Sequence, residues 1–150
     1  MRVAVIFILS LVPFVAFGQE ESLDKLTDRQ KNNIIEVVST WISEMFKAES
    51  VDVLMRISEV PFALDRVKVL TNTDELKEVY LSIFENKGQR EKPKYQVQLL
   101  SYKSEILESC IPVNVVKVRV WLYDEEGDEE GVLVAVLLKQ DEYKIAGFSD

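Results

Sequence analysis

Residues 61–76, PFALDRVKVLTNTDEL, contain the change from extended chain to helix on which the fold assignment depends. Proline disfavours the helical conformation in the residue before it, so Pro61 predicts an extended segment that continues to about Leu70. The apolar residues of this segment do not keep one strict alternation. We therefore expect a bend near Asp65.

The second part of that stretch predicts the start of a helix. Thr71-Asn72-Thr73-Asp74 supplies side chains that suit a helix N-terminus. Apolar residues then recur at spacings of three and four from Leu76 to Phe84, which is the helical period. Gly88 suits the left-handed conformation that ends many helices, so we expect the helix to stop just before it.

Two further helices are predicted before this stretch. Thr27 followed three residues later by Gln30 has the pattern of a capping box, and a broad apolar stripe over residues 28–48 predicts a helix that covers a sheet. A short second helix follows, for which Asp52 is the expected cap. It should end before Pro61, for the reason given above.

The chain after residue 94 has the pattern of strands. Apolar, β-branched and aromatic residues dominate 95–99, 113–124, 132–138 and 143–148, and the last two segments are predicted to form a hairpin. Three helices followed by an antiparallel meander give an α+β layout. We expect the three N-terminal helices to pack on one face of a curved antiparallel sheet.

Residues 1–18 have the layout of a secretory signal peptide. A basic start at Arg2 precedes an apolar run, and small residues stand at Ala16 and Gly18. We expect cleavage after Gly18, a single domain over 19–150, and a secreted or periplasmic protein without membrane attachment after cleavage. The alternative is an uncleaved anchor, but an apolar run of about 15 residues is shorter than the roughly 17–25 that span a bilayer.

Composition excludes several kinds of function. The chain has 18 Lys and Arg against 26 Asp and Glu, a net charge of −8, so a phosphate backbone would repel it and no nucleic-acid partner is expected. It has no His, which removes Ser-His-Asp triads, His-based zinc sites and imidazole proton transfer. The single Cys110 cannot form an internal disulfide and is expected to be a buried structural thiol.

The order of these elements resembles the nuclear transport factor 2-like superfamily, which includes ketosteroid-isomerase-like proteins. The resemblance rests on residues 61–76 and on the closing segment 138–148, LKQDEYKIAGF, and covers nearly all of 28–149. It implies a cystatin-like cone in which helices and a curved sheet enclose a pocket, often in dimers formed through the sheet. It does not imply one function, because the superfamily contains enzymes, binding proteins and non-catalytic modules.

Asp65 is the candidate catalytic residue. It follows an apolar run, so partial desolvation is expected to raise its pKa toward that of a general base. The alternative is that it caps a bend or pairs with Arg66. Isomerase-type sites combine an Asp base with a Tyr and a protonated Asp as donors. No residue of this sequence matches those donors by motif, although Tyr80, Tyr95 and Tyr102 are available.

The strand that begins at Val113 has two unlike faces. Alternate residues from Val116 are aliphatic, and those between them are Lys117, Arg119, Trp121 and Tyr123. If the second face lines the cone, Arg119 would hold an anionic ligand between aromatic walls, because its planar fork suits carboxylates. If that face is the outer one, it would pair two copies as a homodimer. The candidate ligand-binding residues are Trp41, Phe62, Tyr80, Tyr102, Arg119 and Trp121.

The acidic segment 124–131, DEEGDEEG, separates two strands. Its glycines favour a hairpin turn with a solvated acidic tip, and its spacing does not match a helix-loop-helix calcium site. Neither a metal nor a cofactor is expected. The sequence therefore predicts a non-catalytic protein that binds a small apolar molecule or a protein partner. The alternatives are a His-free isomerase, lyase or hydrolase that uses Asp65, and a dimeric interaction module.

Overall fold

The computed structural model describes residues 20–65, 67–106 and 112–150, and every structural statement below concerns these residues. The predicted signal peptide and Cys110 lie outside them. The elements in chain order are β1 (Glu20–Glu21), a short 3-10 helix η1 (Leu23–Lys25), α2 (Asp28–Lys47), α3 (Asp52–Ile57), β2 (Ser58–Leu64), β3 (Lys68–Leu70), α4 (Thr73–Lys87), β4 (Lys94–Ile106), β5 (Pro112–Tyr123), β6 (Glu129–Lys139) and β7 (Glu142–Ser149). This is the predicted α+β layout.

The sheet has seven strands in the order β1-β4-β5-β6-β7-β2-β3. Strands β4 to β7 form the predicted antiparallel meander, and β6 and β7 form the predicted closing hairpin. However, β2 runs parallel to β7, so the sheet is mixed, although most of its strand pairs are antiparallel as predicted. An apolar pattern specifies a strand but not the direction of the strand beside it, which is why the sequence did not reveal this pairing.

The ends of the helices follow local side-chain chemistry. The capping box of α2 is confirmed: Thr27 N–H donates to Gln30 Oε1 at 2.8 Å and Gln30 N–H donates to Thr27 Oγ1 at 3.1 Å. The expected cap of α3 is wrong, because Asp52 is the first helical residue and Val51 precedes it without a side-chain cap. Gly88 ends α4 at a φ of 65°, as predicted.

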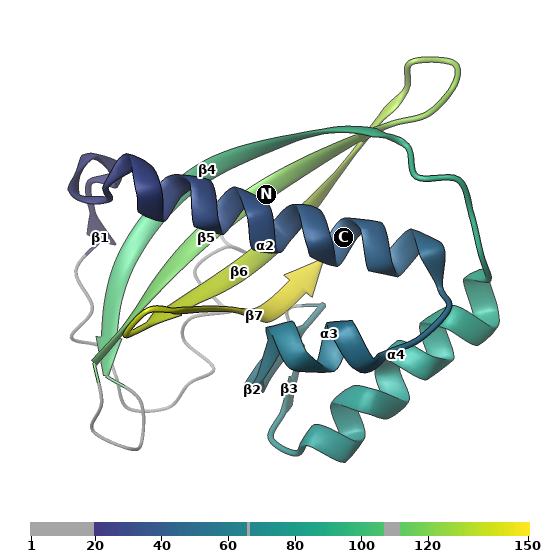
Figure 1. Ribbon diagram of the computed structural model, residues 1–150, viewed down its shortest axis with the longest axis horizontal. Coiled ribbons are helices and arrows are strands. Elements are labelled where there is room, and N and C mark those ends of the chain that lie inside the picture. Colours follow the sequence, from purple (N-terminus) through teal and green to yellow (C-terminus); the bar gives the residue numbers. More distant parts are fainter. Residues whose placement is uncertain (1–19, 66, 107–111) are drawn as a thin grey trace.

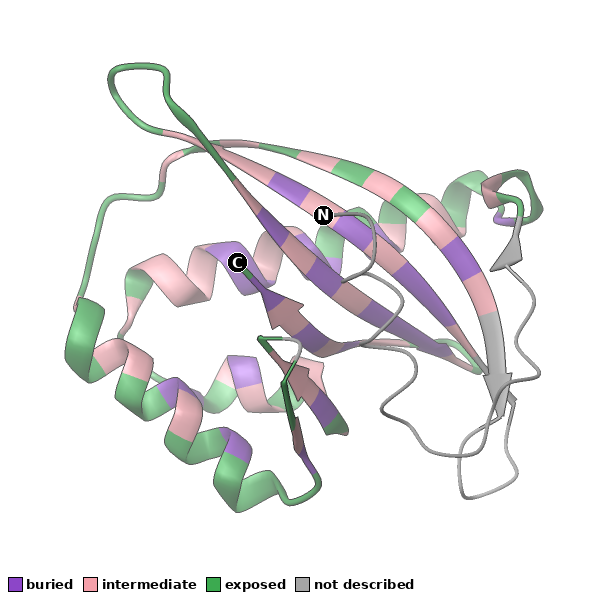
Figure 2. Ribbon diagram, turned by 180° about the vertical axis from the view of Figure 1, so that it is seen from behind, coloured by how far each residue is buried: buried purple, intermediate pink, exposed green. Residues whose placement is uncertain are grey.

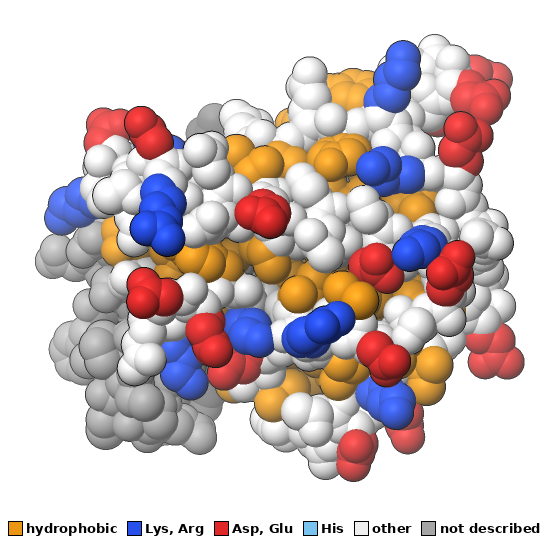
Figure 3. All heavy atoms as spheres, in the orientation of Figure 1, with side chains coloured by type: hydrophobic (Ala, Val, Ile, Leu, Met, Phe, Trp, Pro, Cys, Tyr) orange, Lys and Arg blue, Asp and Glu red, His pale blue; other side chains and the backbone are white. Residues whose placement is uncertain are grey.

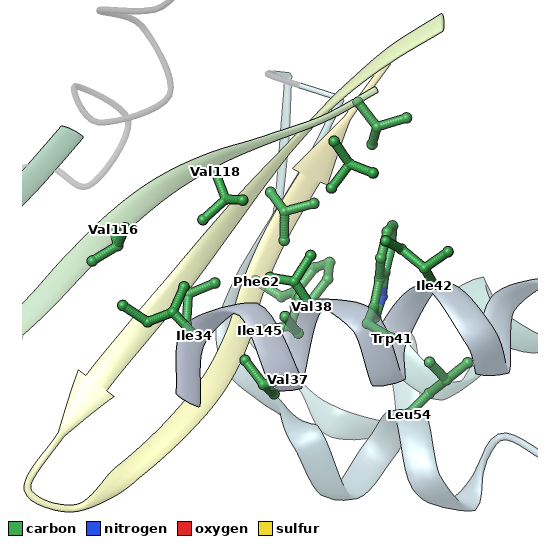
Figure 4. Packing of buried hydrophobic residues seen from close by; sticks show 14 of the residues in the cluster. Ile34, Val37, Val38, Trp41, Ile42, Leu54, Phe62, Val116, Val118 and Ile145 are labelled. Carbon is green, nitrogen blue, oxygen red and sulfur yellow. The ribbon is translucent and has the colours of Figure 1, made fainter. Parts of the chain in front are cut away.

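The helices pack on the concave side of the sheet (Figure 1). In that view α2 crosses in front of β4, β5 and β6, while α3 and α4 lie together below it. The buried stripe of α2 meets the aliphatic face of β5 and β6, as the close view in Figure 4 shows for Ile34, Val38 and Val118. Seen from behind, the central strands alternate buried and less buried residues along their length (Figure 2). One face of each strand therefore belongs to the core and the other does not.

The β2–β3 turn contains the predicted bend. Asp65 has a φ of 50°, and its backbone N–H donates to the Phe148 carbonyl at 3.1 Å, which ties the turn to the end of β7. Strands β2 and β7 also pack closely at Gly147, where an added Cβ would lie 2.6 Å from the Ala63 carbonyl oxygen. The residues 20–65, 67–106 and 112–150 include no helix long and apolar enough to cross a membrane.

Candidate functional site

The cone is hollow toward the C-terminal end of α2. A cavity of about 720 Å³ lies there, bounded by α2, α4, β5 and β6 and by the ends of β2 and β7. This volume is within the range of roughly 300–1,000 Å³ that holds small organic ligands in proteins. The apolar wall consists of Trp41, Ile42, Met45, Phe46, Leu64, Val79, Ile83, Val120, Leu122, Val132 and Phe148.

Charged side chains surround the mouth of this cavity. Carboxylates outnumber cations, and all of these residues are solvent-exposed. The mouth carries Asp65, Glu75, Glu78, Glu130 and Asp150 against Lys68, Lys87 and Arg90. Within the described ranges, no ion pair joins any two of them. Figure 3 shows the wider surface on one side of the molecule, where acidic and basic groups are interspersed with apolar patches.

Arg90 closes one side of the mouth. Its guanidinium carbon lies 4.5 Å from the centre of the Phe46 ring, which is the distance of a cation–π contact. Its backbone N–H also donates to the Phe46 carbonyl at 2.9 Å. The segment after α4 is therefore fixed to the end of α2, and the aromatic wall at this point carries a cation of the chain itself.

A buried hydrogen-bond cluster fixes Trp41, whose ring forms the floor of the cavity. The Trp41 indole N–H donates to the Tyr80 hydroxyl at 3.3 Å, and the Tyr80 and Ser58 hydroxyls share a hydrogen bond of 2.8 Å. Trp41 and Phe148 pack with ring centres 5.2 Å apart, and Phe62 packs edge-on against both Tyr80 and Phe148. Trp41 thus presents a fixed aromatic surface to the cavity.

Burial raises the pKa of the Tyr80 hydroxyl above its ordinary value, because the charged form would lose its hydration. The hydrogen bonds with Ser58 and Trp41 offset part of this rise. Tyr80 is fully buried and does not border the cavity. Its hydroxyl therefore supports the wall and does not face a ligand.

The predicted site residues fall into three groups. Trp41 lines the cavity, and Asp65 lies at its mouth. Asp65 is exposed in the turn after β2, so the expectation that it is partly desolvated is wrong. The proposed partner Arg66 lies outside the described residues. Phe62, Tyr80 and Tyr102 are buried in the core, and they and Tyr95 are absent from the cavity wall.

The interpretation of Arg119 and Trp121 as cavity residues is wrong. Their neighbours Val118 and Val120 point into the cone, so the pleat directs these two side chains to the opposite face of the sheet. There the Arg119 guanidinium lies 5.2 Å from the Trp121 ring centre. The Trp121 ring covers Gly131, where an added Cβ would lie 3.1 Å from it. The alternative interpretation of this face as the outer one is correct.

The acidic turn between β5 and β6 is solvated, as predicted. Residues 124–130 are exposed, and the turn extends beyond the sheet in Figure 1. Asp124 organises it, since its backbone N–H donates to the Asp128 carbonyl at 3.0 Å and its carboxylate accepts from the Asp128 N–H at 2.8 Å. No group of three acidic or cysteine side chains in the described part of the chain is arranged to hold a metal ion.

Sequence reasoning missed most of the cavity wall. Phe46, Val79, Ile83 and Leu122 have the same helical or alternating spacing as fully buried residues. Spacing identifies the face of a helix or strand that turns inward, but not whether an opposing element reaches it. The only available signal was the family resemblance, which implied a pocket without locating it.

Comparison with known proteins confirms the fold. No family model and no curated protein matches the sequence. A crystal structure of a protein of unknown function with a cystatin-like fold, from Nostoc punctiforme, superposes with a TM-score of 0.52 at 11% identity, over 83% of this chain and 91% of that one. This chain has the cystatin-like cone fold. The nuclear transport factor 2-like resemblance is therefore confirmed as a resemblance of fold.

Two other solved structures are similar to this chain. The helical cell shape determining protein of Campylobacter jejuni superposes with a TM-score of 0.52 at 12% identity, over 83% of this chain and 42% of that one. The association domain of CaMKII from C. elegans has a TM-score of 0.43 at 12% identity, over 81% of this chain and 94% of that one. At these identities the likeness concerns the fold alone, and no specific function follows from it.

Proposed function

We propose that this protein binds a small, mostly apolar molecule in the cavity without transforming it. The observation that carries the proposal is the open, aromatic-floored cavity of about 720 Å³. Apolar surface that faces water gains roughly 25 cal/mol per Å² when a ligand covers it. A ligand would therefore bind chiefly by covering this wall.

The wall also needs little rearrangement to accept a ligand. The hydrogen bond to Tyr80 and the contact with Phe148 fix the Trp41 ring through the protein's own side chains. Surfaces that are ordered before binding lose less conformational entropy on binding. This arrangement favours a binding protein.

The enzyme alternative has less support. A general base in a cone needs a nearby group that stabilises developing charge, and such a donor is typically worth about 3–4 kcal/mol. The one candidate base, Asp65, is exposed, and no tyrosine of the described chain borders the cavity. If native mass spectrometry reveals a co-purified molecule, its conversion by the wild type but not by Asp65→Asn would favour the enzyme.

Tryptophan fluorescence tests the binding proposal. The chain has two tryptophans, so Trp121→Phe leaves Trp41 as the sole reporter at the cavity. Titration with octyl glucoside below its micelle concentration should give a saturable change in emission. In the same background, Val79→Phe should weaken binding by roughly ten-fold or more, because the larger ring occupies the cavity.

Leu81→Phe is the matched control, since Leu81 lies on α4 but is exposed and does not line the cavity. It should leave octyl glucoside binding unchanged. A titration without saturation, or equal binding by the Val79→Phe variant, would contradict the proposal.

We also propose that the protein is exported and acts outside the cytoplasm. The support is the three-part pattern of residues 1–18, which ends in small residues at Ala16 and Gly18. Intact mass measurement of the exported protein should give a chain that starts at Gln19. A chain that retains residues 1–18 would contradict this proposal.

We propose, in addition, that two copies pair through the outer face of the sheet. The support is that Arg119 and Trp121 lie on that face, and these residue types are typical anchors of protein interfaces. Trp121→Glu should convert a dimer into monomers in light scattering. A wild-type protein that is already monomeric at high concentration would contradict this pairing.

A further inference from the structure

The charges at the mouth of the cavity constrain the ligand more than the wall does. Among the described residues, five carboxylates and three cations surround the opening, in a chain whose net charge is −8. The field outside the cavity is therefore negative. Such a field raises the local concentration of cations and lowers that of anions.

Two of the carboxylates stand beside each other on one helix. Glu75 and Glu78 are three residues apart on α4, so they are neighbours on its surface, and both border the cavity. Like charges at this spacing repel each other, and neither carboxylate forms an ion pair among the described residues. A cation placed between them and the cavity would relieve that repulsion.

The cations at the mouth do not balance these carboxylates. Arg90 lies over the Phe46 ring at the opposite end of α4 from Glu75. Lys87 occupies the last turn of α4, where its charge complements the helix dipole. Of the three described cations at the mouth, only Lys68 lies close in sequence to the start of α4, and it borders the same cavity as Asp65 and Glu75.

The wall beneath the mouth suits a cationic head as well. Trp41, Phe46 and Phe148 present aromatic rings to the cavity, and the contact between Arg90 and Phe46 shows that one of these rings already accepts a cation. Aromatic faces attract organic cations by their negative quadrupole, and quaternary ammonium groups are bound in this way.

We propose that the ligand is a cationic amphiphile, with an apolar part on the aromatic wall and a protonated or quaternary amine at Glu75 and Glu78. This inference rests on the proposed function, because it names the chemical class that the same cavity takes. It replaces the anionic ligand that the sequence suggested, since Arg119 lies outside the cone.

The test compares three probes with one alkyl chain: octyltrimethylammonium, octyl glucoside and octanoate, each below its micelle concentration. Binding is followed by Trp41 emission in the Trp121→Phe protein at low salt. We expect octyltrimethylammonium to bind roughly three- to ten-fold more tightly than octyl glucoside, and octanoate to bind most weakly. Added salt should reduce the preference for the cation, because these charges are exposed.

The double variant Glu75→Gln/Glu78→Gln should remove the preference for the cation, because it weakens the binding of octyltrimethylammonium more than that of octyl glucoside. Glu85→Gln is the matched control, since Glu85 is exposed on the same helix and does not border the cavity. It should keep the preference. Urea unfolding of the double variant shows independently whether it is folded.

The outcomes separate this inference from the proposed function. Binding of octyl glucoside without a preference for the cation, or a preference that survives in the double variant, would overturn the cationic ligand alone. Tighter binding of octanoate would overturn it in favour of an anionic ligand. Failure of all three probes to bind would contradict the proposed function as well.

Discussion

The two ends of the cone are built from the same kinds of residue, yet one end is filled and the other is open. In the filled half, Ile34 and Val38 of α2 and Val116 of β5 belong to one hydrophobic cluster, and all three are fully buried. In the open half, Phe46 of the same helix and Leu122 of the same strand are only partly buried and border the cavity.

The position of α4 accounts for this difference. In the filled half, α2 lies directly against the sheet, whereas α4 packs on α3, β2 and β3. The cavity is the space that remains between α4, the end of α2 and the strands β5 and β6. The comparison teaches that the same apolar pattern fills the core at one end and lines a cavity at the other.

Truncating one isoleucine in each half gives the largest expected difference. Ile34→Ala should lower the free energy of unfolding by about 2–5 kcal/mol, because it leaves a void in a filled core. Ile83→Ala should cost less than about half of that, since Ile83 already borders the cavity. Urea unfolding of the two variants measures both values, and equal losses would show that the open half is closed in solution.

Removal of the Tyr80 hydroxyl tests the buried hydrogen-bond cluster that supports the cavity wall. Tyr80→Phe leaves the Trp41 indole N–H and the Ser58 hydroxyl without this partner, and we expect a loss of about 1–3 kcal/mol in urea unfolding. The variant should also broaden the change in Trp41 emission that octyl glucoside causes, because the Trp41 ring is less firmly fixed. A loss near zero would show that water replaces the hydroxyl.

Alkaline pH provides a second test of the same group. The pKa of Tyr80 is raised in the folded state, so the folded protein holds this proton more tightly than the unfolded chain. The resulting stability is fully present below the unfolded pKa of about 10, and it is lost as pH rises through the folded pKa. The free energy of unfolding should therefore fall above about pH 10, and less steeply in Tyr80→Phe. Identical slopes in both proteins would contradict the assigned burial.

The acidic turn should have the smallest effect, because it belongs to neither half. Replacing residues 124–128 by Asn-Gly keeps the pairing of Tyr123 with Glu129 and should change the free energy of unfolding by less than about 0.5 kcal/mol. Urea unfolding checks this, and calorimetry with calcium should give no tight binding in the wild type. Tight calcium binding that disappears in the shortened variant would show that the turn is a metal site.

The sequence predicted local features of this fold better than it predicted the site. The capping box at Thr27 and the glycine stop at Gly88 depend on neighbours in the chain, and both are confirmed. The parallel pairing of β2 with β7 depends on segments far apart in the chain, and no local pattern encodes it.

The prediction of the site shows the same difference between features set by neighbours in the chain and features set by distant segments. Alternation predicted correctly that β5 has two unlike faces, but alternation is symmetric and does not state which face is inner. The sequence therefore left two alternatives for Arg119, inside the cone or on the outer face of the sheet. The structure places Val118 and Val120 inside, and Arg119 on the outer face. Asp65 is exposed in a turn where its own φ is 50°, and an apolar run before it does not reveal that exposure.

Methyl NMR with octyl glucoside tests the difference between the two halves most directly. The account predicts that saturating octyl glucoside shifts the methyl signals of Ile42, Val79 and Val132, which border the cavity, and leaves those of Ile34, Val116 and Val136 in place. Unchanged signals in the open half, or shifts confined to Leu133 on the outer face, would contradict it.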